Sequence, residues 1–387
     1  MDPGANGDLG QDDAETDRAA MRIVFWQSMV TRHQAALVRA LSMMPDVDVT
    51  YVAAEEVDAR RAGMGWTAPD LGKATLHMAP DASSIARLAA GFGPEDVHLC
   101  QGFRGNGVIE TALPSLAARG ARIGVMMEAV DQRGLSGSIK LPVYWSRIRK
   151  FRGQVRFCLA VGQDAAAFVA RCGFPEERIF PFTYFTDPPA PAESPETGGF
   201  RLVYAGQLVQ LKRVDLLIDA VASLDRPDVR LSIAGDGPML AELKTQVDKK
   251  LDAQQVEWLG TLPPDEVQTL IQRSDCLVLP SEYDGWGAVV SEALLAGVPA
   301  ICSDACGAAE AVRGSHRGGV FTSGDAADLA GLLRQQLQAG APDRPERQAI
   351  AAWAEASLSG AAGGKYLTDI LTSAFGQSPA PKAPLLT

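Results

Sequence analysis

The chain has 387 residues, of which 47% are hydrophobic and 21% are charged, and its formal net charge is −11. The length predicts two domains, because single cores stop growing beyond roughly 250–300 residues, and the composition is typical of a globular protein and excludes an intrinsically disordered one. The acidic balance and the absence of any known nucleic-acid-binding motif argue against a nucleic-acid partner.

The N-terminus does not resemble a folded or targeting segment. Residues 1–20 hold six acidic residues against Arg18 and almost no large apolar side chains, which predicts a disordered acidic tail. This segment lacks the apolar core of a secretory signal. The sequence also contains no run of roughly eighteen apolar residues, so we expect no transmembrane helix. The six cysteines show no zinc spacing, so we expect reduced thiols and a cytoplasmic protein.

Short apolar runs then alternate with helical stretches. This alternation predicts a parallel sheet covered by helices on both faces, and therefore an N-terminal Rossmann-like domain over 21–186. The expected strands lie at 22–26, 47–54, 96–103, 122–128, 157–162 and 178–185.

Residues 187–199 contain four prolines and two glycines without an apolar run, which predicts an interdomain linker. The alternation then restarts, so we expect a second Rossmann-like domain over 200–346. A long helical segment over 347–375 and a frayed tail over 376–387 end the chain. Two such domains form a cleft that faces the carboxyl ends of their strands. The strands expected in the second domain are 201–206, 229–235, 256–260, 276–280 and 299–303.

The segment 280–307 carries the most specific pattern. A buried strand ends in a loop with Asp284 and Gly287, and a helix follows. Glycine lets the backbone approach a ligand closely, and the free N–H groups at a helix start suit a phosphate. Glu292 lies one turn into the helix, where it can accept hydrogen bonds from ribose hydroxyls, and Asp284 can hold sugar hydroxyls. The alternative is a solvated acidic loop before an ordinary helix.

This segment resembles the signature of the retaining family 4 glycosyltransferases. In that signature an acid and a Gly-Phe-Gly precede a second Glu, eight positions after the first acid, and then Ala and Gly-x-Pro. The resemblance implies donor-sugar contact for Asp284, which replaces the usual Glu, and ribose binding for Glu292. It also implies that the backbone amides of Gly287, Ala288 and Val289 cradle the diphosphate. The matching positions are Asp284, Gly285, Trp286, Gly287, Glu292, Ala293, Gly297 and Pro299.

Residues 205–220 resemble the phosphate motif of the same family, in which Gly-Arg-Leu precedes a Lys. Gly206 and Lys212 fit, whereas Gln207 stands where Arg is usual. A charged contact worth about 1.5–3 kcal/mol is thereby lost, and Arg213 is a candidate to replace it. From the residues alone, a Lys before a helix is more often solvated; the resemblance implies a phosphate role for Lys212.

Two further turns complete the expected donor site. The Gly-x-Gly at Gly235 follows a strand, but Leu240 occupies the third glycine position of a dinucleotide motif, so that alternative is weak. The segment resembles instead the Gly-Asp-Gly-Pro turn of the same glycosyltransferases. A later segment resembles the one that packs beside the nucleotide base, and it carries Gly260, Thr261 and Leu262.

The N-terminal half matches the family in outline. His33 opens the first helix, where the fold faces the cleft, although a lone His is more often structural. Glu128 ends a strand where many relatives carry a His; it can meet the sugar or acceptor, or cap the next helix. With Lys212 and Asp284, these two residues are the candidate catalytic groups. The pair Asp46 and Asp48 spells a metal-binding Asp-x-Asp, but we interpret it as a turn and predict no metal and no cofactor.

Residues 140–156 hold six cations and no acid, with Tyr144, Trp145 and Phe151 among them. This combination favours docking on an anionic membrane surface, and the alternatives are a solvated face or an acceptor-phosphate site.

Taken with the resemblance, these patterns predict an α/β protein of the GT-B fold, whose C-terminal helix crosses back to the N-terminal domain. The implied activity is metal-independent transfer of a sugar, with retention, from a nucleoside-diphosphate sugar to a glycan or lipid-linked acceptor. Polysaccharide or glycoconjugate biosynthesis on the inner face of the membrane is the expected setting. The alternatives are an epimerase or hydrolase on the same fold, and a non-catalytic nucleotide-sugar-binding subunit.

Overall fold

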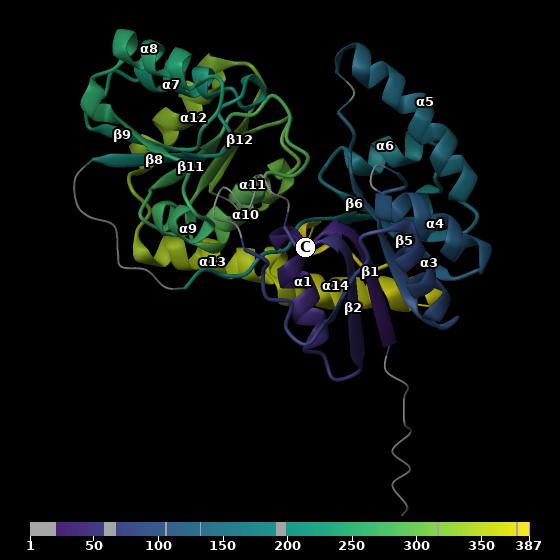
Figure 1. Cartoon of the computed structure of the whole chain (residues 1–387). Helices are drawn as coiled ribbons and strands as arrows, with labels where there is room; N and C mark the ends of the chain where they lie inside the picture. The colour runs from purple at the N-terminus through teal and green to yellow at the C-terminus, as the bar shows by residue number, and fades with distance from the viewer. Residues whose placement is uncertain are drawn as a thin grey trace, which may run out of the picture.

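The computed structural model describes residues 21–57, 67–104, 107–131, 133–190, 199–315, 317–376 and 378–386. Two α/β domains lie side by side, the first in purple and blue and the second in teal and green (Figure 1). The predicted acidic tail over 1–20, and residues 191–198 of the predicted linker, lie outside the described residues.

Within the described residues, the first domain contains a parallel seven-stranded sheet in the order β3-β2-β1-β4-β5-β6-β7. Strands buried on both faces read as continuous apolar runs, which is why the sequence predicted most of them. The edge strand β3 was not predicted, because all its residues are exposed. The strands are β1 (Met21–Met29), β2 (Val47–Glu55), β3 (Thr75–Met78), β4 (Val97–Gln101), β5 (Arg122–Glu128), β6 (Val155–Val161) and β7 (Ile179–Phe182).

Helices connect these strands and cover the sheet (Figure 1). Among them α5 carries most of the predicted basic segment. The helices are α1 (Arg32–Ser42), α3 (Ala82–Gly91), α4 (Gly107–Ala118), α5 (Gly134–Phe151) and α6 (Ala165–Arg171), with a 3₁₀ turn at Glu176–Arg178.

The described part of the second domain forms a parallel six-stranded sheet in the order β10-β9-β8-β11-β12-β13. The edge strand β13 was not predicted, since it starts with two glycines and has no continuous apolar run. The strands are β8 (Phe200–Ala205), β9 (Val229–Ala234), β10 (Val256–Gly260), β11 (Cys276–Leu279), β12 (Ala300–Ser303) and β13 (Gly318–Phe321).

The connections of the second domain are also helical. The helices are α7 (Val214–Ala222), α8 (Leu240–Lys250), α9 (Pro264–Gln272), α10 (Ala288–Leu295), α11 (Ala309–Gly314) and α12 (Ala326–Ala339), with 3₁₀ turns at Gln210–Lys212 and Ala253–Gln255.

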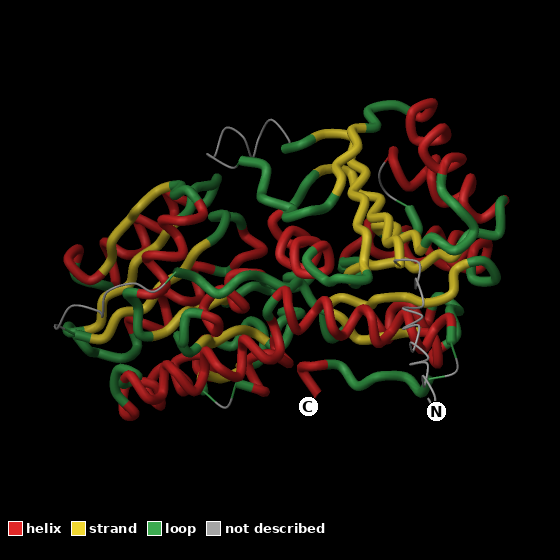
Figure 2. The backbone as a smooth tube through the Cα atoms, turned by 90° about the horizontal axis from the view of Figure 1, so that it is seen from below, coloured by secondary structure: helices red, strands yellow, loops and turns green. Residues whose placement is uncertain are grey.

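The last helical segment, predicted over 347–375, contains two helices. The described chain forms α13 (Arg344–Leu358) and α14 (Gly360–Phe375), with a 3₁₀ turn at Pro384–Leu386 near the end. Ser359 ends α13 in an extended conformation and caps α14 through its hydroxyl, which accepts a hydrogen bond from the Ala362 amide at 3.1 Å. Figures 1 and 2 show α13 along the second domain and α14 along the first.

The predicted return of the chain to the first domain is confirmed by the packing of α14. The Tyr366 hydroxyl donates to the carbonyl of Pro181 in β7 at 3.0 Å. The ring of Phe375 lies edge-on to Phe157 with centroids 6.0 Å apart. The chain therefore leaves the second domain through α13 and packs again on the first domain through α14.

Candidate active site

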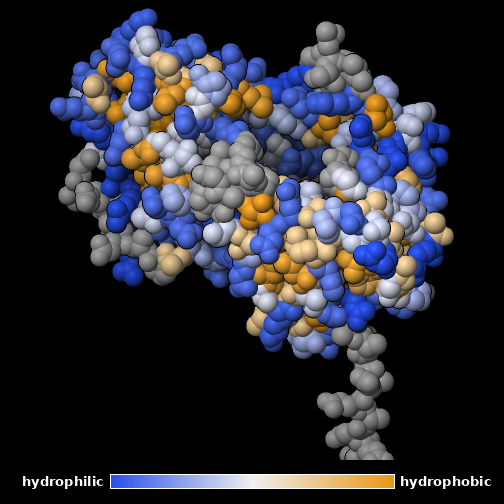
Figure 3. Space-filling model, viewed as in Figure 1, coloured by the Kyte–Doolittle hydropathy of each residue, from blue (hydrophilic) through white to orange (hydrophobic). Residues whose placement is uncertain are grey.

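Three adjoining cavities lined by described residues follow the cleft between the domains, and their volumes are about 780, 530 and 330 Å³. His33 and Ala288 line all three, so the start of α1 and the start of α10 lie where the cavities meet. The space-filling view shows the molecule hollowed between the domains (Figure 3).

The largest cavity gathers most of the predicted donor-binding residues. They come from the carboxyl ends of β8, β9 and β10 and from the start of α10, far apart in the sequence. A space of this size suits a nucleotide. The predicted residues on its wall are Gly206, Gln207, Gly235, Thr261, Leu262, Ala288, Val289 and Glu292.

Close backbone approach explains a glycine at the end of β9. Gly235 has φ of 152°, and a Cβ there would lie 1.8 Å from the carbonyl oxygen of Gly206. The Gly235 amide donates to the carbonyl of Gly260 at 2.7 Å. These contacts hold the three loops beneath the cavity in one layer. Gly260 itself does not line the cavities; it accepts this hydrogen bond and precedes Thr261.

The loop before α10 has the geometry expected of an anion-binding helix start. Gly287 has φ of 90°, and a Cβ there would lie 2.8 Å from the Cys306 sulfur, so the position requires glycine. Ala288 and Val289 form the first turn of α10 and line the largest cavity. Their amides belong to the first turn, whose N–H groups have no partner within the helix.

Trp286 is 2% exposed, and its indole donates to the Ser291 hydroxyl at 3.0 Å. This side chain therefore braces the loop against α10, although it also lines the edge of the 530 Å³ cavity.

Lys212 and Asp284 form an ion pair. The ammonium lies 2.6 Å from the Asp284 carboxylate, and the side chains are 21% and 18% exposed. Lys212 ends the 3₁₀ turn after β8, and the Glu282 amide donates to the carbonyl of Leu211 at 2.9 Å. The phosphate motif and the acidic loop are thus joined in space.

The structure places Arg213 elsewhere. Its backbone is left-handed, with φ of 50°, and its guanidinium lies 3.0 Å from Asp215. Arg213 lines none of the three cavities, and its own ion pair holds it there. Gln207, in contrast, lines the largest cavity. The expected replacement of the missing Arg by Arg213 is therefore not seen.

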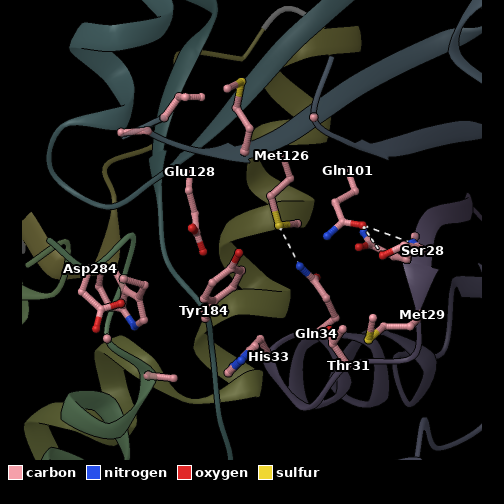
Figure 4. Close-up of a pocket in the computed structure, with 18 of the residues that line it drawn as sticks. Ser28, Met29, Thr31, His33, Gln34, Gln101, Met126, Glu128, Tyr184 and Asp284 are labelled. Carbon is pink, nitrogen blue, oxygen red and sulfur yellow. Dashed lines mark hydrogen bonds between the residues drawn. The ribbon is translucent and has the colours of Figure 1, made fainter. Parts of the chain in front are cut away.

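Glu128 reaches across the cleft from the end of β5. A Cβ on Gly285 would lie 2.0 Å from its Oε2, so the Glu128 carboxylate rests on the bare backbone of the acidic loop. Burial raises the pKa of Glu128, a hydrogen bond from Tyr184 opposes this, and Asp284 raises the pKa further. Glu128 and Asp284 face the 530 Å³ cavity together (Figure 4).

His33 and Glu292 lie where the cavities meet. The His33 ring stacks on Tyr184 with centroids 5.2 Å apart. Glu292 lines the two other cavities, and burial raises its pKa to about 7, although the nearby Arg32 lowers it. Arg32 is itself paired with Asp265 of the second domain at 3.2 Å.

A row of glutamines lies on the first-domain wall of the 530 Å³ cavity, and sequence reasoning missed Gln27 and Gln101 among them. Gln27 and Gln101 lie at the carboxyl ends of the neighbouring strands β1 and β4, and Gln34 lies in α1. The available signal was a polar residue at the end of an otherwise apolar strand.

The predicted absence of a metal site stays a prediction. Among the described residues, no group of three or more His, Cys, Asp or Glu side chains is placed to hold an ion. Asp48 of the Asp-x-Asp lies in β2 and pairs with Arg22 at 2.9 Å.

The basic segment exposes aromatic and cationic side chains on α5. Trp145 is 47% exposed, and the Arg149 guanidinium lies 4.7 Å from the centre of its ring. The Lys150 ammonium lies 5.3 Å from the centre of the Phe151 ring, whereas Arg147 pairs with Glu110 at 2.5 Å. In the described part of the chain, no helix is both long and apolar enough to span a bilayer.

Comparison with known proteins assigns part of the chain. A family model described as Glycosyl transferases group 1 matches residues 190–354. Glycogen synthase of Mycobacterium tuberculosis H37Rv is 36% identical over 169 residues, 42% of this chain and 40% of that protein. The chain thus spans two fifths of that relative's length. A GDP-mannose-dependent alpha-(1-6)-phosphatidylinositol monomannoside mannosyltransferase of Mycolicibacterium smegmatis is 26% identical over 308 residues, 71% of this chain and 76% of that protein.

Solved structures extend the likeness to both domains. Anabaena HepE in complex with UDP matches with a TM-score of 0.70 and 16% identity, over 91% of this chain and 100% of that one. The likeness confirms the predicted two-domain GT-B fold. Residues 190–354 of this chain are therefore a glycosyl transferases group 1 domain.

Proposed function

We propose that this protein transfers a sugar, with retention and without a metal, from a nucleoside-diphosphate sugar to a glycan or lipid-linked acceptor. The observation that carries the proposal is the Lys212–Asp284 pair beside the start of α10. Asp284 lines the 530 Å³ cavity, Lys212 lies behind it, and Ala288 at the start of α10 lines both this cavity and the nucleotide-sized one. The known partners of similar proteins support it: HepE was solved with UDP and with UDP-glucose.

Each group then has a role in the transfer. Lys212 and the amides of the first turn of α10 stabilise the negative charge that grows on the leaving diphosphate, which is usually the largest catalytic contribution. Glu292 accepts hydrogen bonds from ribose, while Asp284 and Glu128 orient the sugar from opposite sides. We propose displacement on the face that the diphosphate leaves, with a phosphate oxygen accepting the proton of the acceptor hydroxyl.

The lipid-linked acceptor is proposed from two observations. The mycolicibacterial relative is named for a phosphatidylinositol mannoside acceptor. The exposed Trp145 on α5, with Arg149 over its ring and Lys150 over the ring of Phe151, suits the interface of an anionic membrane. The expected setting in polysaccharide or glycoconjugate assembly, at the inner face of the membrane, is part of the same proposal.

A thermal-shift screen of the purified protein against UDP, GDP, ADP, TDP and their sugar conjugates, without metal, tests the donor half. A stabilising shift for one nucleotide family supports the proposal, and no shift for any of them overturns it. The anomeric configuration of the product by NMR then tests retention. Conversion of the donor without any acceptor would favour the epimerase or hydrolase alternative.

A further inference from the structure

We infer that the 530 Å³ cavity binds an uncharged, hydroxyl-rich acceptor, the end of a neutral sugar or polyol, through the amides of Gln27, Gln34 and Gln101. This inference rests on the proposed function, because it names the acceptor class of the same site. It depends on the first-domain wall of the cavity, which the donor-binding motifs do not include.

The first observation is the placement of the three side chains. Gln27 ends the apolar stretch of β1, and Gln101 ends β4, the central strand of the sheet, which lies beside β1. Gln34 approaches from the first turn of α1 (Figure 4). In open parallel sheets, ligands bind at the carboxyl ends of adjacent strands, so these amides lie where a ligand is expected.

The second observation is that three of the four polar atoms of the buried Gln27 and Gln34 side chains lack a hydrogen-bond partner within the described chain. Gln27 is 1% exposed, and neither its Nε2 nor its Oε1 makes a hydrogen bond. Gln34 is 5% exposed; its Nε2 contacts the Met126 sulfur at 3.1 Å, and its Oε1 is unpaired. Buried polar groups are almost always paired, and leaving one unpaired destabilises a fold. Glutamine at these positions is therefore explained by a ligand better than by stability.

The third observation concerns chemistry. A primary amide offers two donors and two acceptors, which matches hydroxyl groups that both donate and accept. Gln101 already accepts hydrogen bonds from the amide of Ser28 at 3.1 Å and from its hydroxyl at 3.3 Å, which fixes its orientation. Gln27 and Gln34 line the cavity, so we expect a change of rotamer to bring their unpaired atoms to a ligand hydroxyl.

The fourth observation is the charge around the cavity. The described residues that line it include Glu128 and Asp284 but no Lys or Arg, and Lys212 behind them is paired with Asp284. A phosphate or carboxylate on the acceptor would face two acidic side chains and no Lys or Arg on the described wall of the cavity, and such like-charge contacts are strongly unfavourable. The cavity therefore selects an uncharged group.

The test is binding measured by saturation-transfer NMR, with and without the nucleotide found by thermal shift. The probes are glucose, galactose, mannose, N-acetylglucosamine and myo-inositol, with their phosphates and the available uronates. Octyl glycosides of the sugars distinguish a soluble acceptor from the sugar end of a lipid. We expect a neutral probe to bind at least roughly tenfold more tightly than its anionic counterpart.

Gln27→Met and Gln34→Met keep the side-chain size and remove the amide. We expect each substitution to weaken binding of that neutral probe roughly tenfold, because it removes one to two hydrogen bonds. Nucleotide binding should stay unchanged, and the melting temperature should stay unchanged or rise. Gln255→Met is the matched control: this glutamine is also buried, with 8% of it exposed, but its Nε2 donates to the carbonyl of Arg226 at 3.0 Å. It should lower the melting temperature and leave probe binding intact.

Three results would overturn the inference: no neutral probe binds, anionic probes bind as tightly, or neither glutamine substitution weakens binding. Failure of the proposed function gives a different result, because no nucleotide would then produce a thermal shift. The two results are distinguishable, since none of these three glutamines lines the nucleotide cavity.

Discussion

The Lys212 ammonium and the Asp284 carboxylate lie 2.6 Å apart although their motifs are 72 residues apart in the sequence. The pair keeps a partly buried cation neutralised in the free protein. It also places that cation beside the start of α10, where a diphosphate would bring a second anionic partner. On the proposed function, the interaction would hold this cation in place before the donor binds.

We predict that Lys212→Ala lowers turnover roughly 100- to 1,000-fold while the protein stays folded, because it removes a donor aimed at growing charge. Single-turnover transfer assays and melting curves measure the two effects. Lys250→Ala is the control, since its ammonium also lies 2.6 Å from a carboxylate, that of Asp219, at an exposed surface. Unchanged turnover in Lys212→Ala would contradict the mechanism.

Gly285→Ala tests the contact between the acidic loop and the first domain. The new methyl group would lie 2.0 Å from Glu128 Oε2, so the flexible carboxylate must withdraw from the sugar end of the cleft. We expect turnover to fall about tenfold or more with unchanged affinity for the free nucleotide, as measured by kinetics and calorimetry.

Gly331→Ala in α12 controls for a glycine substitution in open space, because nothing lies within 4 Å of its added Cβ. It should stabilise the protein slightly, by roughly 0.5–1 kcal/mol, without affecting turnover. Equal turnover in Gly285→Ala and the unsubstituted protein would show that Glu128 does not act at the sugar.

The fold could be predicted because its features are local, whereas the donor loops were predicted from their resemblance to a family signature. Buried parallel strands appear as apolar runs, and Gly235 and Gly287 are required by their own backbone geometry. The first-domain wall could not be predicted in this way. Gln27 and Gln101 become neighbours only through the strand order β1-β4. Glu128 gains its environment only when the two domains meet.

Binding to anionic vesicles tests α5. We predict that Arg149→Gln with Lys150→Gln weakens binding to phosphatidylglycerol vesicles about 30-fold at low salt, because each cation near the surface contributes about 1 kcal/mol. Co-sedimentation measures this. Lys249→Gln with Lys250→Gln, on α8 of the second domain, is the matched control. Equal loss from both pairs, or binding to neutral vesicles alone, would contradict docking through α5.

Glu292 makes stability depend on pH. Its pKa is raised from 4.5 to about 7 by burial, so the unfolded chain loses this proton at lower pH than the folded one. The favourable contribution of the protonated group is complete below pH 4.5 and is lost as the pH rises through 7. Glu292→Gln should therefore raise the free energy of unfolding at pH 8 by up to about 3 kcal/mol, and by much less at pH 4.5.

The same substitution separates stability from function. In the proposed donor site the ionised carboxylate accepts hydrogen bonds from ribose. On that proposal Glu292→Gln should weaken nucleotide binding roughly 10- to 100-fold at pH 8, where it stabilises the free protein. Urea unfolding and calorimetry at both pH values measure the two effects. Glu257→Gln, on β10 and hydrogen-bonded to Ser232 at 3.2 Å, is the control. Normal nucleotide binding by the Glu292→Gln variant would contradict a role for Glu292 in the donor site, and burial would then be its only distinguishing property.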